Sequence, residues 1–137
     1  MKLLLDTHVL VWLLDDSARI SDSAHEQLQQ SADQDRLFVS AITPWEIAML
    51  VSKGRLRLSR DVAEWIGAAL NLPGIRLEPL SPAIAVASTR LPWEVHGDPA
   101  DRILLATARH LDATLVTIDS EILGYSELGF VKCIAPS

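Results

Sequence analysis

Residues 1–16 read MKLLLDTHVLVWLLDD, and the apolar run Leu3–Leu5 with Asp6 directly after it decides how the chain is interpreted. A short run that is apolar at every position is typical of a strand buried on both faces of a sheet. The stretch superficially resembles a secretory signal, but Asp6 and His8 interrupt it and no small-residue cleavage site follows. We therefore expect it to belong to a folded domain.

Membrane insertion and disulfide bonding are both disfavoured by the sequence. The longest unbroken apolar stretch at this end, Val9–Leu14, is far shorter than the roughly 20 residues that a membrane-spanning helix needs. Cys133 is the only cysteine, which excludes an intramolecular disulfide. We expect a cytoplasmic protein without a membrane segment.

Four more apolar runs follow the first, and helical patterns separate them. The expected strands are Leu3–Leu5, Leu37–Val39, Ile75–Leu77, Leu115–Ile118 and Phe130–Ile134. Capping residues and first-turn prolines predict helices from Ser23 toward Gln30, from Thr43, over Asp61–Leu70, from Ser81-Pro82, and from Asp98-Pro99 to Leu111. Alternating strands and helices predict a parallel sheet covered on both faces, and the chain has about the length of one domain. We predict a single three-layer α/β/α domain over residues 1–137 with a short central parallel sheet.

Acidic residues stand where the predicted strands end. Asp6 and Asp119 each follow a strand directly, and Glu46 falls in the first turn of the helix after the second strand. Asp98 and Asp101 share one face at the start of another helix. The carboxyl edge of an open parallel sheet is where such folds place their sites. We therefore expect these five carboxylates to converge at one edge.

Each of these acids also has a simpler interpretation as a helix cap or a first-turn residue. A cap contributes roughly 1 kcal/mol, whereas two carboxylates about 4 Å apart repel by about 4 kcal/mol at an effective dielectric near 20. A converging set would therefore need protons or a cation. Because the donors are all oxygen, Mg²⁺ or Mn²⁺ is the expected ion, with one or two bound.

The charge balance agrees with this interpretation. Twelve Lys and Arg stand against eighteen Asp and Glu, which gives a net charge of −6 and argues against binding nucleic acid through basic charge alone. Without the five candidate acids, thirteen acidic side chains face twelve basic ones. Basic residues gather at Lys53, Arg55, Arg57 and Arg60. This cluster is either a solvated loop or a weak RNA-binding site that flanks the carboxylates.

Several other kinds of site are excluded. The sequence has no P-loop, no G-x-G-x-x-G dinucleotide fingerprint and no G-x-S-x-G nucleophile elbow. His8, His25, His96 and His110 have no zinc-like spacing with one another or with Cys133. An aspartyl phosphatase usually has a second Asp two residues after the first, and here His8 stands at that position.

Four ordered segments, LLDTHVLVWLL, TPWEIA with KGRLRL, HGDPADRILLATA and LVTID, together resemble the PIN domain, and within it the VapC-type toxins of bacterial toxin–antitoxin pairs. The resemblance covers nearly the whole chain. It implies a Mg²⁺- or Mn²⁺-dependent ribonuclease that often forms homodimers and is inhibited by a cognate antitoxin. It identifies Asp6, Glu46, Asp101 and Asp119 as the metal-binding catalytic acids. It also implies accessory roles for Asp98 and for two hydroxyl neighbours of the acids, Thr7 and Thr117.

This chain departs from the family pattern at two places. Ala100 stands where many relatives have Phe, a change that we expect to alter packing only. Met49 and Leu50 stand where some relatives have a lysine. If that lysine contacts the substrate, Lys53 or Arg55 would make the contact in this chain.

The sequence also carries more apolar helix surface than one small sheet face needs, at Leu10, Trp12, Leu13, Leu14, Ile66, Ala69 and Leu70. We expect part of this surface to contact a second copy or an antitoxin. Trp45 is next to Glu46, but an aromatic residue at a helix start is more often a packing residue than a base-stacking one. We expect the same packing role for the other tryptophans, Trp12, Trp65 and Trp93.

Two alternatives to an RNA-cleaving enzyme remain open. A DNA-directed metal nuclease would use the same carboxylates. A metal-free interaction module would use them only as helix caps, and Asp6→Asn would then have no effect on function.

Overall fold

The computed structural model describes residues 1–93 and 97–137, and its centre is one parallel sheet with the strand order β3-β2-β1-β4-β5. The strands are β1 (Leu3–Leu5), β2 (Leu37–Ser40), β3 (Ile75–Glu78), β4 (Thr114–Val116) and β5 (Lys132–Ile134). The helices are α1 (Thr7–Leu14), α2 (Asp22–Asp33), α3 (Ile42–Ser52), α4 (Val62–Leu70), α5 (Pro82–Ala87), α6 (Pro99–Leu111) and α7 (Ser120–Glu127). None of the helices in the described part of the chain is long and apolar enough to cross a membrane. The predicted α/β/α class is confirmed.

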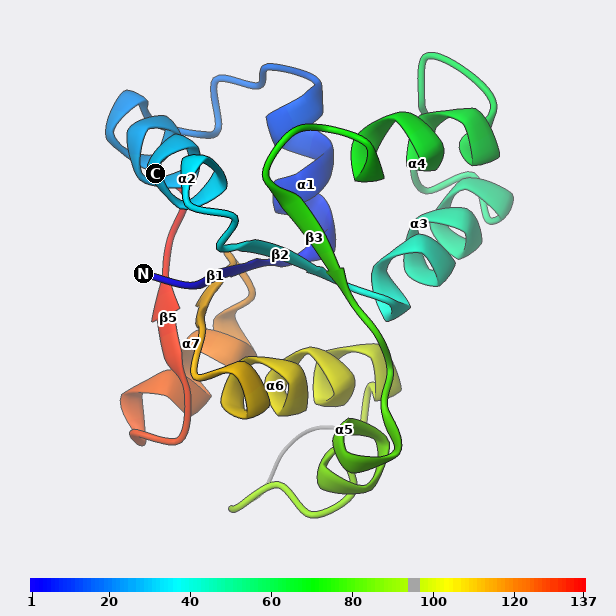
Figure 1. Cartoon of the computed structure of the whole chain (residues 1–137). Helices are drawn as coiled ribbons and strands as arrows, with labels where there is room; N and C mark the ends of the chain where they lie inside the picture. The colour runs from blue at the N-terminus through cyan, green and yellow to red at the C-terminus, as the bar shows by residue number, and fades with distance from the viewer. Residues whose placement is uncertain (94–96) are drawn as a thin grey trace.

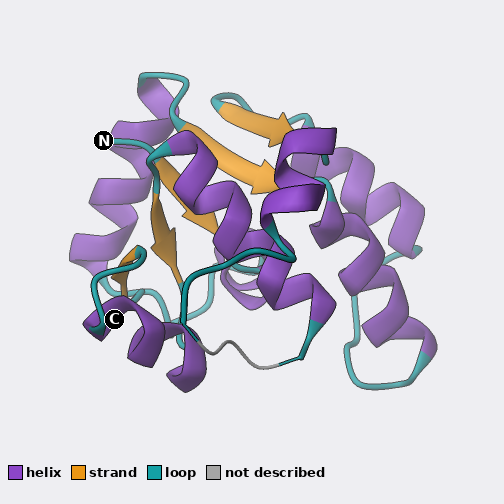
Figure 2. Cartoon of the chain, turned by 90° about the horizontal axis from the view of Figure 1, so that it is seen from below, coloured by secondary structure: helices purple, strands orange, loops and turns teal. Residues whose placement is uncertain are grey.

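Helices cover both faces of the sheet, as Figures 1 and 2 show. Alternate residues of β1 serve the two layers. Leu3 and Leu5 pack into a core with residues of α1, α2 and α4, and Leu4 packs into a second core with residues of α6 and α7. Because β1 lies at the centre of the sheet and is buried on both faces, its sequence is apolar at every position.

The structure corrects two predicted helix starts. The capping box expected at Ser23 is wrong: α2 begins at Asp22, and the hydroxyl of Ser21 accepts the cap bond from Ala24 N at 3.1 Å. The cap expected at Thr43 is also wrong. That helix, α3, begins at Ile42 without a side-chain cap, and Thr43 is buried inside its first turn. The sequence contains several adjacent residues that are able to cap, and tertiary packing selects among them.

The last predicted strand boundaries also shift. The expected strand Leu115–Ile118 ends at Val116 in β4, because the next three residues form the turn into α7. In that turn Asp119 N donates to the hydroxyl of Thr117 at 3.0 Å. The last strand was expected over Phe130–Ile134. In the structure it is shorter, because β5 begins only at Lys132.

Much of the apolar helix surface from which the sequence predicts a partner contact packs inside the chain. Leu10 and Ala69 are fully buried. The remaining side chains pack against the same core and are partly buried: Trp12, Leu13, Leu14, Ile66 and Leu70. Because α1 and α4 contribute to one shared core, only the part of these side chains that stays exposed is left for the expected contact with a second copy or an antitoxin, which stays a prediction.

One glycine is required by a close approach of two backbones. Gly74 has a φ of +83°, and a Cβ atom there would lie 2.2 Å from the carbonyl oxygen of Ala32 at the end of α2. We expect Gly74→Ala to destabilise the fold by about 2 kcal/mol, because the left-handed conformation and the contact both penalise a side chain. Urea unfolding measures this change.

Gly67→Ala is the matched control for that variant. Gly67 lies within α4, and nothing stands within 4 Å of the place that a Cβ atom would occupy there. Alanine there is expected to stabilise the helix by up to about 1 kcal/mol. Equal midpoints for the two variants would contradict the proposed contact at Gly74.

Candidate active site

The candidate site lies at the carboxyl edge of the sheet, where the strand order reverses. From β1 the chain first builds β2 and β3 on one side and later places β4 and β5 on the other. Asp6 directly follows β1, and its backbone N–H donates to Val116 O at the end of β4, at 3.0 Å. Parallel sheets bind ligands in the crevice at such a reversal point. The fold therefore brings the ends of β1, β2 and β4 to one place.

Two buried threonines connect the acidic side chains at this edge. The Thr117 hydroxyl donates to Asp6 Oδ2 at 2.6 Å, and the Thr7 hydroxyl donates to Glu46 Oε1. Thr7 N also donates to Asp6 Oδ1, at 2.7 Å. Thr7 and Thr117 are only 1% and 0% exposed. They are positioning residues, because each fixes the orientation of a carboxylate that comes from another element.

Two of the acids cap helices while they line the same edge. Asp98 Oδ1 accepts from Ala100 N at 2.9 Å and from Asp101 N at 3.3 Å at the start of α6. Asp119 Oδ1 accepts from the second and third residues of α7 at 2.9 and 3.0 Å. In both residues the cap bonds use one carboxylate oxygen. Capping and membership of the acidic site are therefore compatible at this edge.

The charges of the five acids interact in a single group. Burial, followed by repulsion from the other four carboxylates, raises the pKa of Asp101 to about 7. The four are Asp98, Asp119, Asp6 and Glu46. Burial is also the main cause that raises the pKa of Asp6 and of Glu46, although hydrogen bonds from the threonines partly offset it. Residues separated by more than a hundred positions in the chain thus share one electrostatic environment.

The donor chemistry of this group fits a hard divalent cation. Carboxylate and hydroxyl oxygens are the ligands that Mg²⁺ and Mn²⁺ prefer, and burial together with mutual repulsion raises the pKa of Asp6, Glu46 and Asp101. As the side chains stand in residues 1–93 and 97–137, no three His, Cys, Asp or Glu side chains are close enough to share an ion.

Sequence reasoning missed one neighbour of this group. His8 lies exposed in the first turn of α1, and its charge interaction lowers the pKa of both Asp6 and Glu46. Its ring also lies 6.3 Å from the ring of Trp12. In the sequence, the only sign of this role is that His8 lies two residues after Asp6. From the sequence alone, that residue argues only against a zinc site and an aspartyl phosphatase.

The basic cluster lies outside the carboxylate group. Lys53 ends α3, and the three arginines follow in the exposed loop before α4, at positions 55, 57 and 60. Glu46 is in the first half of the same helix, so about 10 Å of helix separates it from Lys53. The cluster flanks the site at a distance and does not contribute to its polar contacts.

Two of the tryptophans are exposed, contrary to the sequence prediction. Trp45 and Trp93 are 54% and 71% exposed, so their expected packing role is wrong, whereas Trp65 is buried as predicted. Trp45 presents its ring to solvent beside Glu46. His96, the first residue of the H-G-D-P-A-D-R segment, lies outside the described residues.

We expect Thr117→Val to reduce the activity of this site by about 10- to 100-fold, the usual effect of removing a group that orients a metal ligand. The variant loses the hydroxyl bonds to Asp6 and from Asp119 N but keeps the side-chain shape. Turnover and divalent-ion affinity, measured together, test the expectation.

Thr107→Val provides the control for that measurement. Thr107 is equally buried, but its hydroxyl donates to Ile103 O within α6. A similar loss of activity in both variants would mean that general packing, and not orientation of Asp6, explains the effect.

Comparisons with known proteins agree with this fold. The PIN domain family model matches residues 3–128. Ribonuclease VapC22 of Mycobacterium tuberculosis is 33% identical over 119 residues, which cover 87% of this chain and 88% of that protein. A chain of the DNA-bound VapBC2 structure from Rickettsia felis superposes with a TM-score of 0.71 at 18% identity, covering 98% of both chains. A chain of the DNA-bound VapBC structure from Salmonella typhimurium gives 0.68 at 12% identity, covering 100% of this chain and 99% of that one. With its parallel sheet and its acidic carboxyl edge, this chain belongs to the PIN domain family.

Proposed function

We propose that this chain is a metal-dependent ribonuclease and the toxin of a toxin–antitoxin pair. One observation carries the proposal: burial and four neighbouring carboxylates raise the pKa of Asp101 to about 7 at the carboxyl edge of the sheet. Such a concentration of negative charge needs a cation, and a cation there allows a phosphodiester to approach. The similarity to Ribonuclease VapC22 and to chains of VapBC complexes supports RNA as the substrate class and an antitoxin as the partner.

The proposed chemistry is hydrolysis of an RNA phosphodiester. Asp6, Glu46, Asp101 and Asp119 would hold one or two Mg²⁺ or Mn²⁺ ions, with Asp98 as an accessory acid. A bound ion supplies the positive charge that activates water and stabilises the phosphorane-like transition state. Thr7 and Thr117 hold Glu46 and Asp6 in orientation through their hydroxyl groups. By resemblance to the family, the bond to the RNA 3′ oxygen breaks and the product carries a 5′-phosphate.

The partners of this function follow from the same resemblance. A cognate antitoxin would inhibit the enzyme, and a homodimer is the expected oligomer. We place the protein in the cytoplasm because its proposed substrate is there. Sedimentation of the purified chain, alone and with the antitoxin, measures both associations.

We expect that replacing Lys53, Arg55 and Arg57 together by Gln weakens RNA binding and lowers its salt dependence. All three side chains are exposed and flank the carboxylates at the far end of α3. Each lost phosphate contact reduces the slope of log affinity against log salt by about 0.7 for a single strand. Fluorescence anisotropy with a labelled RNA at several salt concentrations measures the slope. An unchanged slope would mean that this cluster is a solvated loop that does not bind RNA.

The test of the proposed function is to induce the wild type and Asp101→Asn in cells and to map new RNA 5′ ends. New ends with the wild type alone support the proposal, and equal cleavage by both proteins removes Asp101 from the catalytic site. The purified protein is also given RNA and single-stranded DNA of one sequence with Mg²⁺ or Mn²⁺. Equal cutting of both would identify a DNA-directed nuclease. No cutting together with no calorimetric ion binding would identify an interaction module.

A further inference from the structure

A second site candidate is a hollow on the outer side of α6, away from the carboxylates. Its volume is about 430 Å³, and residues of α5, residues of α6 and the segment 90–92 form its walls. The polar part of its lining is basic and consists of Arg90, Arg109 and His110. Small apolar side chains and Pro92 form the remainder, and none of the described lining residues is acidic.

Hydrogen bonds hold the walls of this hollow in place. The Tyr125 hydroxyl donates to Pro92 O at 2.6 Å and so holds the segment 90–92 against α7. Arg102 on α6 donates to Ser88 O at 3.4 Å, which ties the end of α5 to the same helix. The Arg109 guanidinium donates to Phe130 O and is therefore fixed at the rim. The hollow is thus a defined feature of the fold.

The basic lining is unusual in a protein of this composition. The chain has a net charge of −6, yet the described residues around the hollow carry two permanent positive charges and a histidine without a compensating acid. In residues 1–93 and 97–137 no acidic side chain pairs with the exposed guanidinium of Arg90. A bound anion would therefore compensate the positive charge of this surface. Arg side chains bind phosphate in a bidentate geometry.

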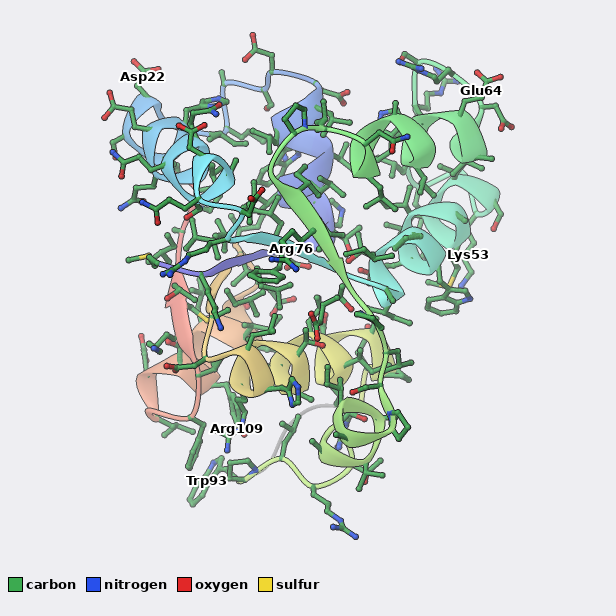
Figure 3. All side chains as sticks on the ribbon, in the orientation of Figure 1. Asp22, Lys53, Glu64, Arg76, Trp93 and Arg109 are labelled. Atoms are coloured by element: carbon green, nitrogen blue, oxygen red, sulfur yellow. The ribbon has the colours of Figure 1, made fainter. Side chains whose placement is uncertain are left out.

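The shape and the apolar lining favour a nucleotide over a simple ion. The volume falls in the range of sites that enclose a small molecule, and Ala83, Val86 and Ala87 offer apolar surface for a ribose or a base. Trp93 follows Pro92 directly and is 71% exposed. Figure 3 shows Trp93 and Arg109 projecting from the same end of the molecule. An exposed indole is a stacking platform for a base, and arginines beside it hold the phosphate.

The hollow is within reach of a strand that crosses the candidate active site. Asp101 and Arg109 lie on one helix, so about 12 Å of α6 separates them. Figure 1 shows α3 and α6 starting near each other and then diverging, and the two helices are in contact. The exposed basic loop follows the far end of α3, and the hollow lies along the far half of α6.

We propose that the hollow between α5 and α6 is a second nucleotide subsite for single-stranded RNA, in which Arg90 and Arg109 hold a backbone phosphate outside the cleavage site. This inference rests on the proposed ribonuclease function. It assigns two tasks to α6, since its first turn carries Asp101 and its last turn carries Arg109, one of the two phosphate contacts.

The test measures RNA binding without cleavage, in protein that already carries Asp101→Asn and in the presence of Mg²⁺. We expect Arg90→Gln to weaken binding of a labelled 20-nucleotide RNA by about tenfold, because one charge-assisted contact is lost. The salt slope should fall by about 0.7. A dinucleotide bound only at the cleavage site lacks this contact, so the substitution should weaken its binding at least fivefold less than that of the 20-nucleotide RNA. Arg90 is chosen because Arg109 also bonds to Phe130 O and its replacement risks the fold.

Arg36→Gln is the matched control, since Arg36 is exposed just before β2 and does not line this hollow. Equal affinities of the Arg90→Gln and Arg36→Gln proteins for the 20-nucleotide RNA would overturn the subsite. RNA cleavage by the protein with Asp101 intact would still support the proposed nuclease. A polyglutamate peptide that competes with RNA only when Arg90 is present would also overturn it, because the hollow would then take an acidic protein segment. If the protein with Asp101 intact cleaves no RNA, the proposed function itself fails.

Discussion

Asp101→Asn is expected to reduce RNA cleavage on the order of 10²–10³-fold and, at the same time, to raise the melting temperature at pH 8 in EDTA. The loss of activity follows because the proposed ion loses a charged ligand worth several kcal/mol in the transition state. The gain in stability follows because burial and four carboxylates oppose ionisation of Asp101, whose pKa is raised to about 7. The asparagine removes that repulsion. Single-turnover kinetics and thermal unfolding measure the two effects.

Glu64→Gln is the control for this pair of measurements, since Glu64 is an exposed acid on α4. It should change neither rate nor melting temperature appreciably. A protein in which Asp101→Asn lowers both activity and stability would indicate a structural acid, and the electrostatic description of the site would then be wrong.

Divalent ions are expected to stabilise the protein, and to do so increasingly as the pH rises. Asp6, Glu46 and Asp101 have pKa values above their ordinary values, so the folded state binds more protons than the unfolded state between about pH 4 and 7. The free energy of unfolding in EDTA therefore falls as the pH rises through this window. Mn²⁺ or Mg²⁺ at about 100 times its dissociation constant adds about 2.7 kcal/mol, or about 10 °C, at pH 8.

The same titration at pH 5 separates this effect from nonspecific salt. At that pH the Asp101 carboxyl is largely protonated, so the ion must displace a proton and the stabilisation should shrink. Calorimetry in two buffers with different ionisation enthalpies should show protons released on binding. An equal increase at both pH values, or the same increase with Asp101→Asn, would contradict a carboxylate site.

The sequence predicts the layers of this fold because its strands and helices differ clearly in their hydrophobic pattern. Strands buried on both faces are apolar at every position, and Leu3–Leu5 agrees with β1 at both ends. Parallel strands place their carboxyl ends at one edge, so the residues after them were expected to meet. The charge interactions of Asp101 with acids from three other segments agree with that expectation.

The connections inside the site were not predictable in the same way. Thr7 and Glu46 are 39 positions apart, and Thr117 and Asp6 are 111 apart. No local rule selects such pairs, because rotamers and backbone shifts of a few tenths of an ångström decide them. The helix starts at Ser21 and Ile42 depended likewise on packing. The basic hollow between α5 and α6 draws on residues from two helices and a turn, and none of them is distinctive alone.

Asp98 and Asp119 start α6 and α7 through a single carboxylate oxygen each. Asparagine offers a carbonyl oxygen at the same place and is as good a helix cap as aspartate. One G-to-A transition in the codon changes aspartate to asparagine, and so it removes the charge while the helix keeps its cap. Under the role proposed for Asp119, a single mutational step thus gives a well-folded protein without activity, and that protein still displays the same outer surface.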